Sequence, residues 1–279
     1  MARARTIQIF LPDGNPRGVK IAEITNRTVQ AVFIPRASVD FALSRDELNN
    51  VGVYFLVGES EDTGKPLVYV GETENCASRL QQHNKSKDFW QYAIVMISKT
   101  KSFTKSCVKY LEWYCHQQAQ KAGRFALENG TQPKEAHLSE SRAADLLDNF
   151  NDIKILVSAL GYKIFDAIEK PTDDDILYCK GKGAIGTGKY TEDGFTVFKG
   201  STCSLKPTKA CASALKKKRD VLCSNGILLE QDGYWVFSED YIFGSPSTAA
   251  CMIMARNANG WKEWKYKNGK TLDEVKRQG

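Results

Sequence analysis

The sequence predicts an α+β protein in which a small antiparallel sheet flanked by helices is followed by a second, smaller α+β domain. Three observations predict this class. Short β-branched or alternating runs, broken by turn residues, occupy 5–36 and 51–73, which is typical of antiparallel strands. Apolar side chains recur at helical spacing over 104–123. After residue 176, short glycine-rich strands alternate with short helices, as expected of a separate domain.

The chain of 279 residues is long enough for two domains that each bury a core. No stretch approaches the roughly 20 apolar residues of a membrane helix, and the N-terminus lacks the apolar run of a signal peptide. We therefore expect a cytoplasmic protein without a membrane partner. The eight cysteines form no C-x-x-C pair, which favours reduced thiols buried as core residues over a zinc site or a disulfide framework.

The net charge of +6 is unevenly distributed along the chain. Residues 1–45 carry seven Lys and Arg against three Asp and Glu, and residues 176–279 carry 17 against 10. Residues 46–175 carry 15 against 20. Basic flanks around an acidic centre fit a protein whose flanks hold a phosphate backbone. Lys-rich surfaces also serve solubility, so charge alone does not decide between these explanations.

The N-terminal segment, residues 1–45, is predicted to form a β-arm in front of the first domain. Strands are expected at 6–11, 19–25 and 29–35, because apolar and polar residues alternate there between turn-forming residues. A short helix is expected at 39–48.

The first domain, residues 46–170, begins with a predicted β-hairpin over 51–73. A helix is expected at 75–84, where Asn75 is a suitable N-cap residue. A buried strand is expected at 92–98, where the sequence is almost continuously apolar.

Longer helices are expected in the second half of this domain. One helix covers 104–123 and ends at a glycine, and one or two amphipathic helices cover 139–161. The charged segment 169–175 lacks a run of apolar residues and contains a proline, so we place a linker at 171–178.

The C-terminal domain, residues 179–279, differs from the first domain in that it consists of turns and short helices and strands. A helix followed by a glycine turn is expected within 204–228. A second helix over 245–261 has Ser245 as its expected cap and ends in an Asn-Gly turn. A hairpin with another Asn-Gly turn is expected over 261–272.

Two short tyrosine motifs lie on the predicted hairpin, Gly-Val-Tyr at 52–54 and Tyr-Val-Gly at 69–71. Antiparallel pairing would bring the two tyrosines side by side. Arg79 and His83 are four residues apart and therefore share one helical face. Glu112 stands in an apolar part of the 104–123 helix, where a carboxylate needs a partner or a metal.

In this order the motifs resemble the GIY-YIG nuclease family over residues 51–130. Val53 and Val70 stand where the family name has isoleucine, and both changes keep a β-branched side chain. The resemblance implies a GIY-YIG nuclease core and metal-dependent hydrolysis of phosphodiester bonds.

The resemblance also implies roles for the charged residues. Glu112 would be the single protein ligand of Mg²⁺, with Mn²⁺ as an alternative, and water would fill the other positions. Arg79 would contact the scissile phosphate through its planar fork of donors.

The remaining candidate catalytic residues are aromatic or polar. Tyr54 would act as the general base, and its usual pKa near 10 requires positive charge nearby. His83 would supply that charge or accept the proton of Tyr54. Tyr69 would orient water or phosphate. Asn129, which follows the Glu112 helix, would hold the site or the DNA backbone.

Each of these residues also has a plainer structural explanation. A helical glutamate can face solvent, and an exposed arginine commonly forms a salt bridge. Two strand tyrosines can simply pack across the sheet. Asn129 precedes a glycine, as in an ordinary turn.

The C-terminal part, roughly 180–279, resembles a domain of undetermined function that is often fused behind GIY-YIG nucleases. Its marks are Ser-Pro-Ser at 245–247, a helix of small residues, and Asn-Gly-Trp at 259–261. It is also similar to a restriction-associated adenine-methylase domain linked to the reading of modified DNA. Basic clusters and aromatic residues could bind phosphates and stack on bases. The candidate DNA-binding residues are Lys206, Lys209, Lys216, Lys217, Lys218, Arg219, Trp235 and Trp264.

We therefore expect a metal-dependent DNA endonuclease, with modification-dependent restriction of phage DNA as the leading hypothesis. A nuclease of repair or recombination that recognises single-stranded or branched DNA is one alternative. A DNA-binding protein without catalytic activity is another. Tryptophans that merely fill a small core would weaken the DNA-reading hypothesis. One site per chain requires a homodimer or two sequential nicks for double-strand cleavage.

Overall fold

The computed structural model describes residues 4–60, 66–167, 175–181, 183–205 and 213–278. The chain divides into two compact units, residues 1–168 and 169–279. Both contain sheets and helices, so the predicted α+β class is confirmed. Among the described residues, no helix combines the length and apolarity needed to cross a membrane.

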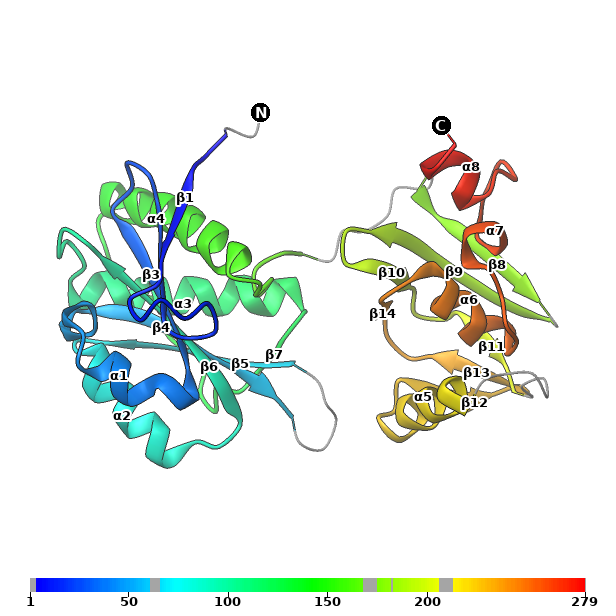
Figure 1. The fold of residues 1–279 in the computed structure, drawn as a ribbon, viewed down its shortest axis with the longest axis horizontal. Coiled ribbons are helices and arrows are strands. Elements are labelled where there is room, and N and C mark those ends of the chain that lie inside the picture. The colour runs from blue at the N-terminus through cyan, green and yellow to red at the C-terminus, as the bar shows by residue number, and fades with distance from the viewer. Residues whose placement is uncertain (1–3, 61–65, 168–174, 182, 206–212, 279) are drawn as a thin grey trace. The chain divides into compact units, whose positions relative to one another are not determined.

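The first unit is built on a seven-stranded sheet with the strand order β1-β2-β3-β6-β4-β5-β7 (Figure 1). Its neighbours pair antiparallel, except that β5 and β7 are parallel. The strands are β1 Ile7–Phe10, β2 Lys20–Ile24, β3 Val29–Pro35, β4 Gly52–Glu59, β5 Pro66–Thr73, β6 Trp90–Ser98 and β7 Ala126–Leu127.

The strands of the expected N-terminal arm belong to this same sheet. Pairing of β3 with β6 runs from Val29↔Ser98 to Pro35↔Tyr92, so no boundary separates the arm from the hairpin. Arg5 and Arg27 also form ion pairs with the buried Asp152. The physical reason is that β3 is apolar on both faces and must be covered on both.

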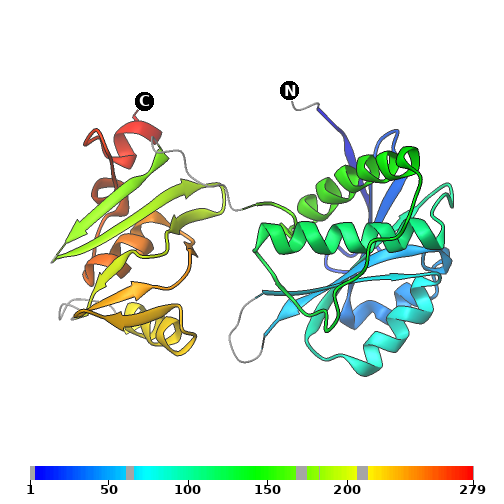
Figure 2. The ribbon, with the colours of Figure 1, turned by 180° about the vertical axis from the view of Figure 1, so that it is seen from behind.

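Helices cover both faces of the sheet (Figures 1 and 2). One face packs against α1 and α2, and the other packs against α3 and α4. The helices are α1 Val39–Leu43, α2 Cys76–Ser86, α3 Lys105–Ala122 and α4 Glu140–Ala159. The expected helix at 39–48 is divided into α1 and a 3₁₀ turn at Asp46–Asn49.

The caps of α2 and α3 follow from their sequences. Asn75 accepts a hydrogen bond from the Ser78 backbone N–H, which confirms the predicted N-cap of α2. Thr104 caps α3 at its N-terminus, and Gly123 ends the helix in the left-handed conformation at φ 68°. These caps fix where α2 and α3 begin, and hence which residues face the sheet.

The predicted hairpin is confirmed by the pairing of β4 with β5, in which Tyr54 faces Gly71. A Cβ atom on Gly71 would lie 2.3 Å from Tyr54 Oη and 2.4 Å from its Cζ. The glycine therefore leaves the space into which the Tyr54 ring folds. Gly52 serves a similar purpose, since a Cβ there would lie 2.8 Å from Cys76 Sγ and 2.7 Å from the Met96 carbonyl oxygen.

The second unit contains a five-stranded sheet and a three-stranded sheet, with the orders β14-β10-β9-β8-β15 and β11-β13-β12. Helix α6 packs against β8, β9, β10 and β11. The strands are β8 Leu177–Gly181, β9 Ala184–Thr191, β10 Gly194–Val197, β11 Thr202–Ser204, β12 Leu228–Gln231, β13 Tyr234–Phe237, β14 Tyr241–Phe243 and β15 Lys265–Tyr266. The helices are α5 Ser213–Ser224, α6 Pro246–Met254, α7 Gly260–Glu263 and α8 Leu272–Lys276.

The Ser-Pro-Ser segment at 245–247 and the Asn-Gly-Trp segment at 259–261 contact each other in this unit. Ser245 caps α6 as predicted, and Ser247 Oγ accepts a hydrogen bond from the Gly260 N–H at 3.1 Å. A Cβ on Gly260 would lie 2.1 Å from the carbonyl of Pro246, so only glycine allows this approach.

The hairpin expected over 261–272 is confirmed from Trp264 to Leu272, where the Tyr266 N–H donates to the Lys270 carbonyl and the Leu272 N–H to the Trp264 carbonyl around the expected Asn-Gly turn. Asn259 caps the short helix α7, and strand pairing is reduced to β15 and one bridge between Lys265 and Thr271. The helix expected over 245–261 is too long, since α6 ends at Met254 with Ala255 in the left-handed conformation, and the Asn-Gly pair at 259–260 begins α7 instead of forming the expected turn.

We predict that Gly71→Ala destabilises the protein by about 1–3 kcal/mol, because the added methyl group displaces the Tyr54 ring. Urea unfolding followed by circular dichroism measures the change.

Gly130→Ala is the matched control, since a Cβ at Gly130 has no atom within 4 Å. Equal stability of the two variants would show that Gly71 does not hold the space for Tyr54.

Candidate active site

The hydroxyl group of Tyr54 is the centre of the candidate site. It lies 2.8 Å from His83 Nε2 and accepts a hydrogen bond from Arg79 Nε at 3.0 Å. Tyr54 comes from β4, and Arg79 and His83 come from one face of α2. Tyr54 is 1% exposed and His83 3% exposed, so these contacts are shielded from water.

Tyr69 completes an aromatic cluster with the same groups. Its ring stacks on Tyr54 with a centroid separation of 6.1 Å, and it meets His83 edge-on at 5.4 Å. The side-by-side arrangement of the two tyrosines is therefore confirmed. Tyr69 is only partly buried, unlike Tyr54.

Burial determines the protonation of the two central groups. Burial raises the pKa of Tyr54, although the hydrogen bond from Arg79 opposes the rise. Burial, followed by the charges of Arg79 and Lys87, lowers the pKa of His83 to about 4. At neutral pH Tyr54 thus keeps its proton, and His83 is neutral and able to accept one.

Arg79 retains unused hydrogen-bonding capacity. Its Nε is engaged by Tyr54 and one terminal nitrogen donates to Gln82 Oε1 at 3.1 Å. Among the described residues no carboxylate forms an ion pair with Arg79. The guanidinium is therefore a cation without an acid partner beside a hydroxyl group, which suits an anionic ligand.

Glu112 lies on α3, on the opposite face of the sheet from α2, and it is close to Glu72 of β5. Burial and then the charge of Glu72 raise the pKa of Glu112 to about 7, while a hydrogen bond from the Glu72 backbone and the charges of Lys105 and Arg79 oppose the rise. The site therefore spans both faces of β5 around Gly71.

Glu72 is the residue that sequence reasoning missed. Its Oε2 is buried and forms an ion pair with Lys105 Nζ at 3.0 Å. Lys105 also lies 3.6 Å from Glu74 Oε2. The alternation of side chains along a strand could have identified Glu72, since residue 72 must share the face of Val70, toward α3.

The donor set at Glu112 fits a magnesium ion. Mg²⁺ is commonly held by one or two carboxylates, with water and substrate phosphate in the other positions, and the neighbouring carboxylates of Glu72 and Glu112 supply such a set. A cation bound nearby would also stabilise the charged form of a carboxyl group whose pKa is raised. Within the described ranges, no cluster of three or more His, Cys, Asp or Glu offers a complete protein cage.

Asn129 does not reach the tyrosines. Its side chain accepts a hydrogen bond from the Val70 N–H at 3.0 Å and donates to the Val70 carbonyl at 2.7 Å. The amide thereby continues the β7 pairing along the edge of β5, beside Tyr69 and Gly71. Of the two roles predicted for Asn129, the contacts match support of the site.

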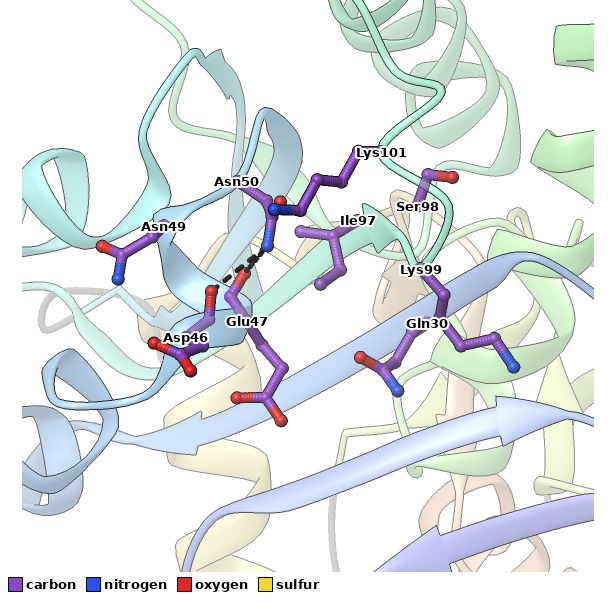
Figure 3. Close-up of a pocket in the computed structure, with 9 residues that line it drawn as sticks. All are labelled: Gln30, Asp46, Glu47, Asn49, Asn50, Ile97, Ser98, Lys99 and Lys101. Carbon is purple, nitrogen blue, oxygen red and sulfur yellow. Dashed lines mark hydrogen bonds between the residues drawn. The ribbon is translucent and has the colours of Figure 1, made fainter.

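A separate polar groove of about 440 Å³ lies near the start of β4 (Figure 3). Asn50 donates to the backbone carbonyls of Asp46 and Glu47, and Lys99 and Lys101 also line the groove. None of the candidate catalytic residues lines it. Carboxylates and lysines line this groove together, so its charge does not favour an anionic ligand.

The predicted DNA-binding residues of the second unit differ in exposure and in their contacts. Lys206 and Lys209 lie outside the described residues. Lys216 and Lys217 are exposed on α5, and Lys218 Nζ lies 5.2 Å above the Phe243 ring. Trp235 on β13 is partly exposed.

Two of these predictions are wrong. Arg219 is 5% exposed and donates to the Met252 carbonyl at 2.7 Å, so it braces α6 instead of facing DNA. Trp264 is fully buried, its ring centroid lies 4.2 Å from that of Phe195, and its Nε1 donates to the Pro246 carbonyl. A buried tryptophan of this kind has no free face for a base.

Comparison with known proteins identifies one part of the chain. Residues 177–276 match a family described as a domain of unknown function, DUF4357, which agrees with the predicted C-terminal domain of undetermined function. No curated protein and no solved structure matches the chain.

We predict that Glu112→Gln stabilises the metal-free protein at pH 8 by about 1–3 kcal/mol. The raised pKa means that the folded protein binds a proton at Glu112 between its ordinary pKa of 4.5 and about 7, while the unfolded chain does not. Stability from this group is complete below pH 4.5 and is lost as the pH rises through about 7, so the variant gains nothing at pH 4. Urea unfolding in a chelator measures the difference.

Addition of Mg²⁺ at pH 8 should raise the melting temperature of the wild type and leave that of Glu112→Gln nearly unchanged. Glu128→Gln, an exposed carboxyl in the same unit, is the control and should behave as the wild type. An equal Mg²⁺ shift in wild type and Glu112→Gln would exclude Glu112 as a ligand.

Proposed function

We propose that the first unit is a Mg²⁺-dependent nuclease that hydrolyses phosphodiester bonds in DNA. The observation that carries the proposal is the Tyr54 hydroxyl group held between Arg79 Nε at 3.0 Å and His83 Nε2 at 2.8 Å. This arrangement combines a proton donor, a proton acceptor and a cation in one shielded place, which are the groups that phosphoryl transfer requires.

The proposed reaction needs only water as a co-substrate. A water oxygen bonds to phosphorus, and one ester bond between phosphorus and oxygen breaks. Tyr54 accepts the proton that water loses while its own proton passes to His83 Nε2. The departing oxygen takes a proton from solvent. Atoms and charges therefore balance without an oxidant or reductant.

Arg79 would position the phosphate beside this hydroxyl group. Its terminal nitrogens have no acid partner among the described residues, and a guanidinium matches two phosphate oxygens. A bound phosphate also brings negative charge close to His83. That charge offsets the cations that lower the pKa of His83 and makes the imidazole a better proton acceptor.

Glu112 and Glu72 would hold the divalent ion, which on binding neutralises the charge that develops on the phosphate oxygens. Lys105 Nζ forms an ion pair with Glu72 Oε2 at 3.0 Å, so a metal ion would compete with Lys105 for this carboxylate. Glu112 must lose its proton before it can bind a metal, because burial raises its pKa to about 7. The proposed activity should therefore require more Mg²⁺ below neutral pH.

The second unit would select the DNA that the first unit cuts. Support comes from the exposed Lys216 and Lys217 and from the partly exposed Trp235, which offer phosphate contacts and an aromatic surface. Because a base modification would be an added group for such a surface to recognise, we propose restriction of modified phage DNA as the biological role. This step rests on the resemblance and on the union of two units in one chain.

We predict that the full chain with Mg²⁺ degrades a phage genome that contains glucosylated hydroxymethylcytosine and spares one with unmodified cytosine. Gel electrophoresis of both genomes measures the cleavage.

Glu112→Ala should abolish cutting and keep DNA binding, since it removes one of the two proposed metal ligands and no proposed DNA contact. Equal cutting of both genomes would contradict the modification dependence and preserve the nuclease. Continued cutting by Glu112→Ala would contradict the nuclease site itself.

A further inference from the structure

We propose that Lys87 binds a second phosphate of the same DNA strand, next to the phosphate held by Arg79. The inference rests on the proposed nuclease function and adds a residue that the motif does not contain. Its starting point is the position of Lys87, which follows Arg79 and His83 at intervals of four and is the C-cap residue directly after α2 ends at Ser86.

The side chain of Lys87 lies against the candidate site. Its Nζ is 4.6 Å from the centre of the Tyr69 ring and 5.9 Å from that of Phe89. Its backbone N–H donates to the His83 carbonyl at 3.0 Å and closes the last turn of α2. The ammonium group is thus fixed at the edge of the aromatic cluster, where Tyr69 is partly exposed.

No acidic side chain neutralises Lys87 in the described structure. The nearest charged neighbour on the chain, Asp88, forms its ion pair with Arg36 instead. A lysine whose ammonium group lies over aromatic rings and has no acidic partner is suited to an anion that arrives from outside.

The contacts of the two cations indicate that this anion is a different phosphate from the one at Arg79. Arg79 Nε bonds the Tyr54 hydroxyl group, whereas Lys87 Nζ lies over the ring of Tyr69, and the centroids of the two rings are 6.1 Å apart. Successive phosphates of one strand repeat at about 3.4 Å along the axis of a duplex, so a separation of this size corresponds to another phosphate on the backbone. Arg79 and Lys87 would thus hold the strand on both sides of His83.

This placement makes Lys87 a positioning residue and not a catalytic one. It would fix the direction of the strand across Tyr69 and His83, while the proton relay remains with Tyr54. A stabilising interaction with the C-terminus of α2 is the competing explanation for a lysine at this place. Lys85 shares that helix terminus and is exposed, so it provides a matched control.

The test measures the salt dependence of duplex binding by the full chain, in a Glu112→Gln background that prevents cleavage. Lys87→Gln is expected to lower the slope of log K against log salt by about 0.9, the value for one lost phosphate contact. Lys87→Arg should restore the slope, and Lys85→Gln should leave it unchanged. In the cleaving protein, Lys87→Gln should raise KM several-fold, because it removes a contact to the substrate.

Equal slopes for Lys87→Gln and Lys85→Gln would overturn the inference. So would a change confined to kcat and its pH profile, because Lys87 would then act only on His83. Failure of the proposed function has a different signature: the wild-type chain with Mg²⁺ would cut no DNA, whatever the slopes of the binding variants.

Discussion

The contact between Gly71 and the Tyr54 ring is the constraint on which the site depends. Antiparallel register sets these two residues opposite each other, and the missing side chain lets the ring lie flat against β5. The Tyr54 hydroxyl then lies within hydrogen-bond distance of both Arg79 and His83 on α2. A side chain at position 71 would displace the Tyr54 ring and move its hydroxyl group away from Arg79 and His83.

The same strand carries the other half of the site on its opposite face. Residues alternate along β5, so Tyr69 and Gly71 face α2 while Val70 and Glu72 face α3. Glu112 of α3 therefore meets Glu72, and Asn129 supports the edge of the strand at Val70. One strand thereby joins a proton relay on one face to a pair of carboxylates on the other.

Local patterns in the sequence were sufficient for the β4–β5 hairpin and for the caps of α2 and α3, but not for the lengths of α1 and α6. The register of two β-branched runs, the Asn75 cap and the glycine at 123 depend only on neighbouring residues. Glu72 and Lys87 were not assigned in this way, and Asn129 was assigned only through the family resemblance, because their contacts join residues far apart in the chain or depend on side-chain direction. Their positions follow from packing of β5 against α3 and from the last turn of α2.

The second unit shows the same limit for tryptophan and arginine. Trp264 and Arg219 lie near basic and aromatic neighbours in the sequence, yet both are buried and bonded to backbone carbonyls. Trp261 instead lies between Tyr190 and Arg277, whose guanidinium is 3.5 Å from the ring centre. Composition alone does not distinguish a tryptophan of the core from one of the surface, since both lie in equally aromatic stretches.

The most direct test of the account is the cleavage rate of Tyr54→Phe on labelled DNA at saturating Mg²⁺, with binding measured in parallel. The substitution removes one oxygen atom and keeps the ring that fills the space beside Gly71. Loss of a general base predicts a rate lower by about 10²–10⁴-fold with unchanged DNA affinity. Cleavage by Tyr54→Phe within a few-fold of the wild-type rate would contradict the proposed relay from water through Tyr54 to His83.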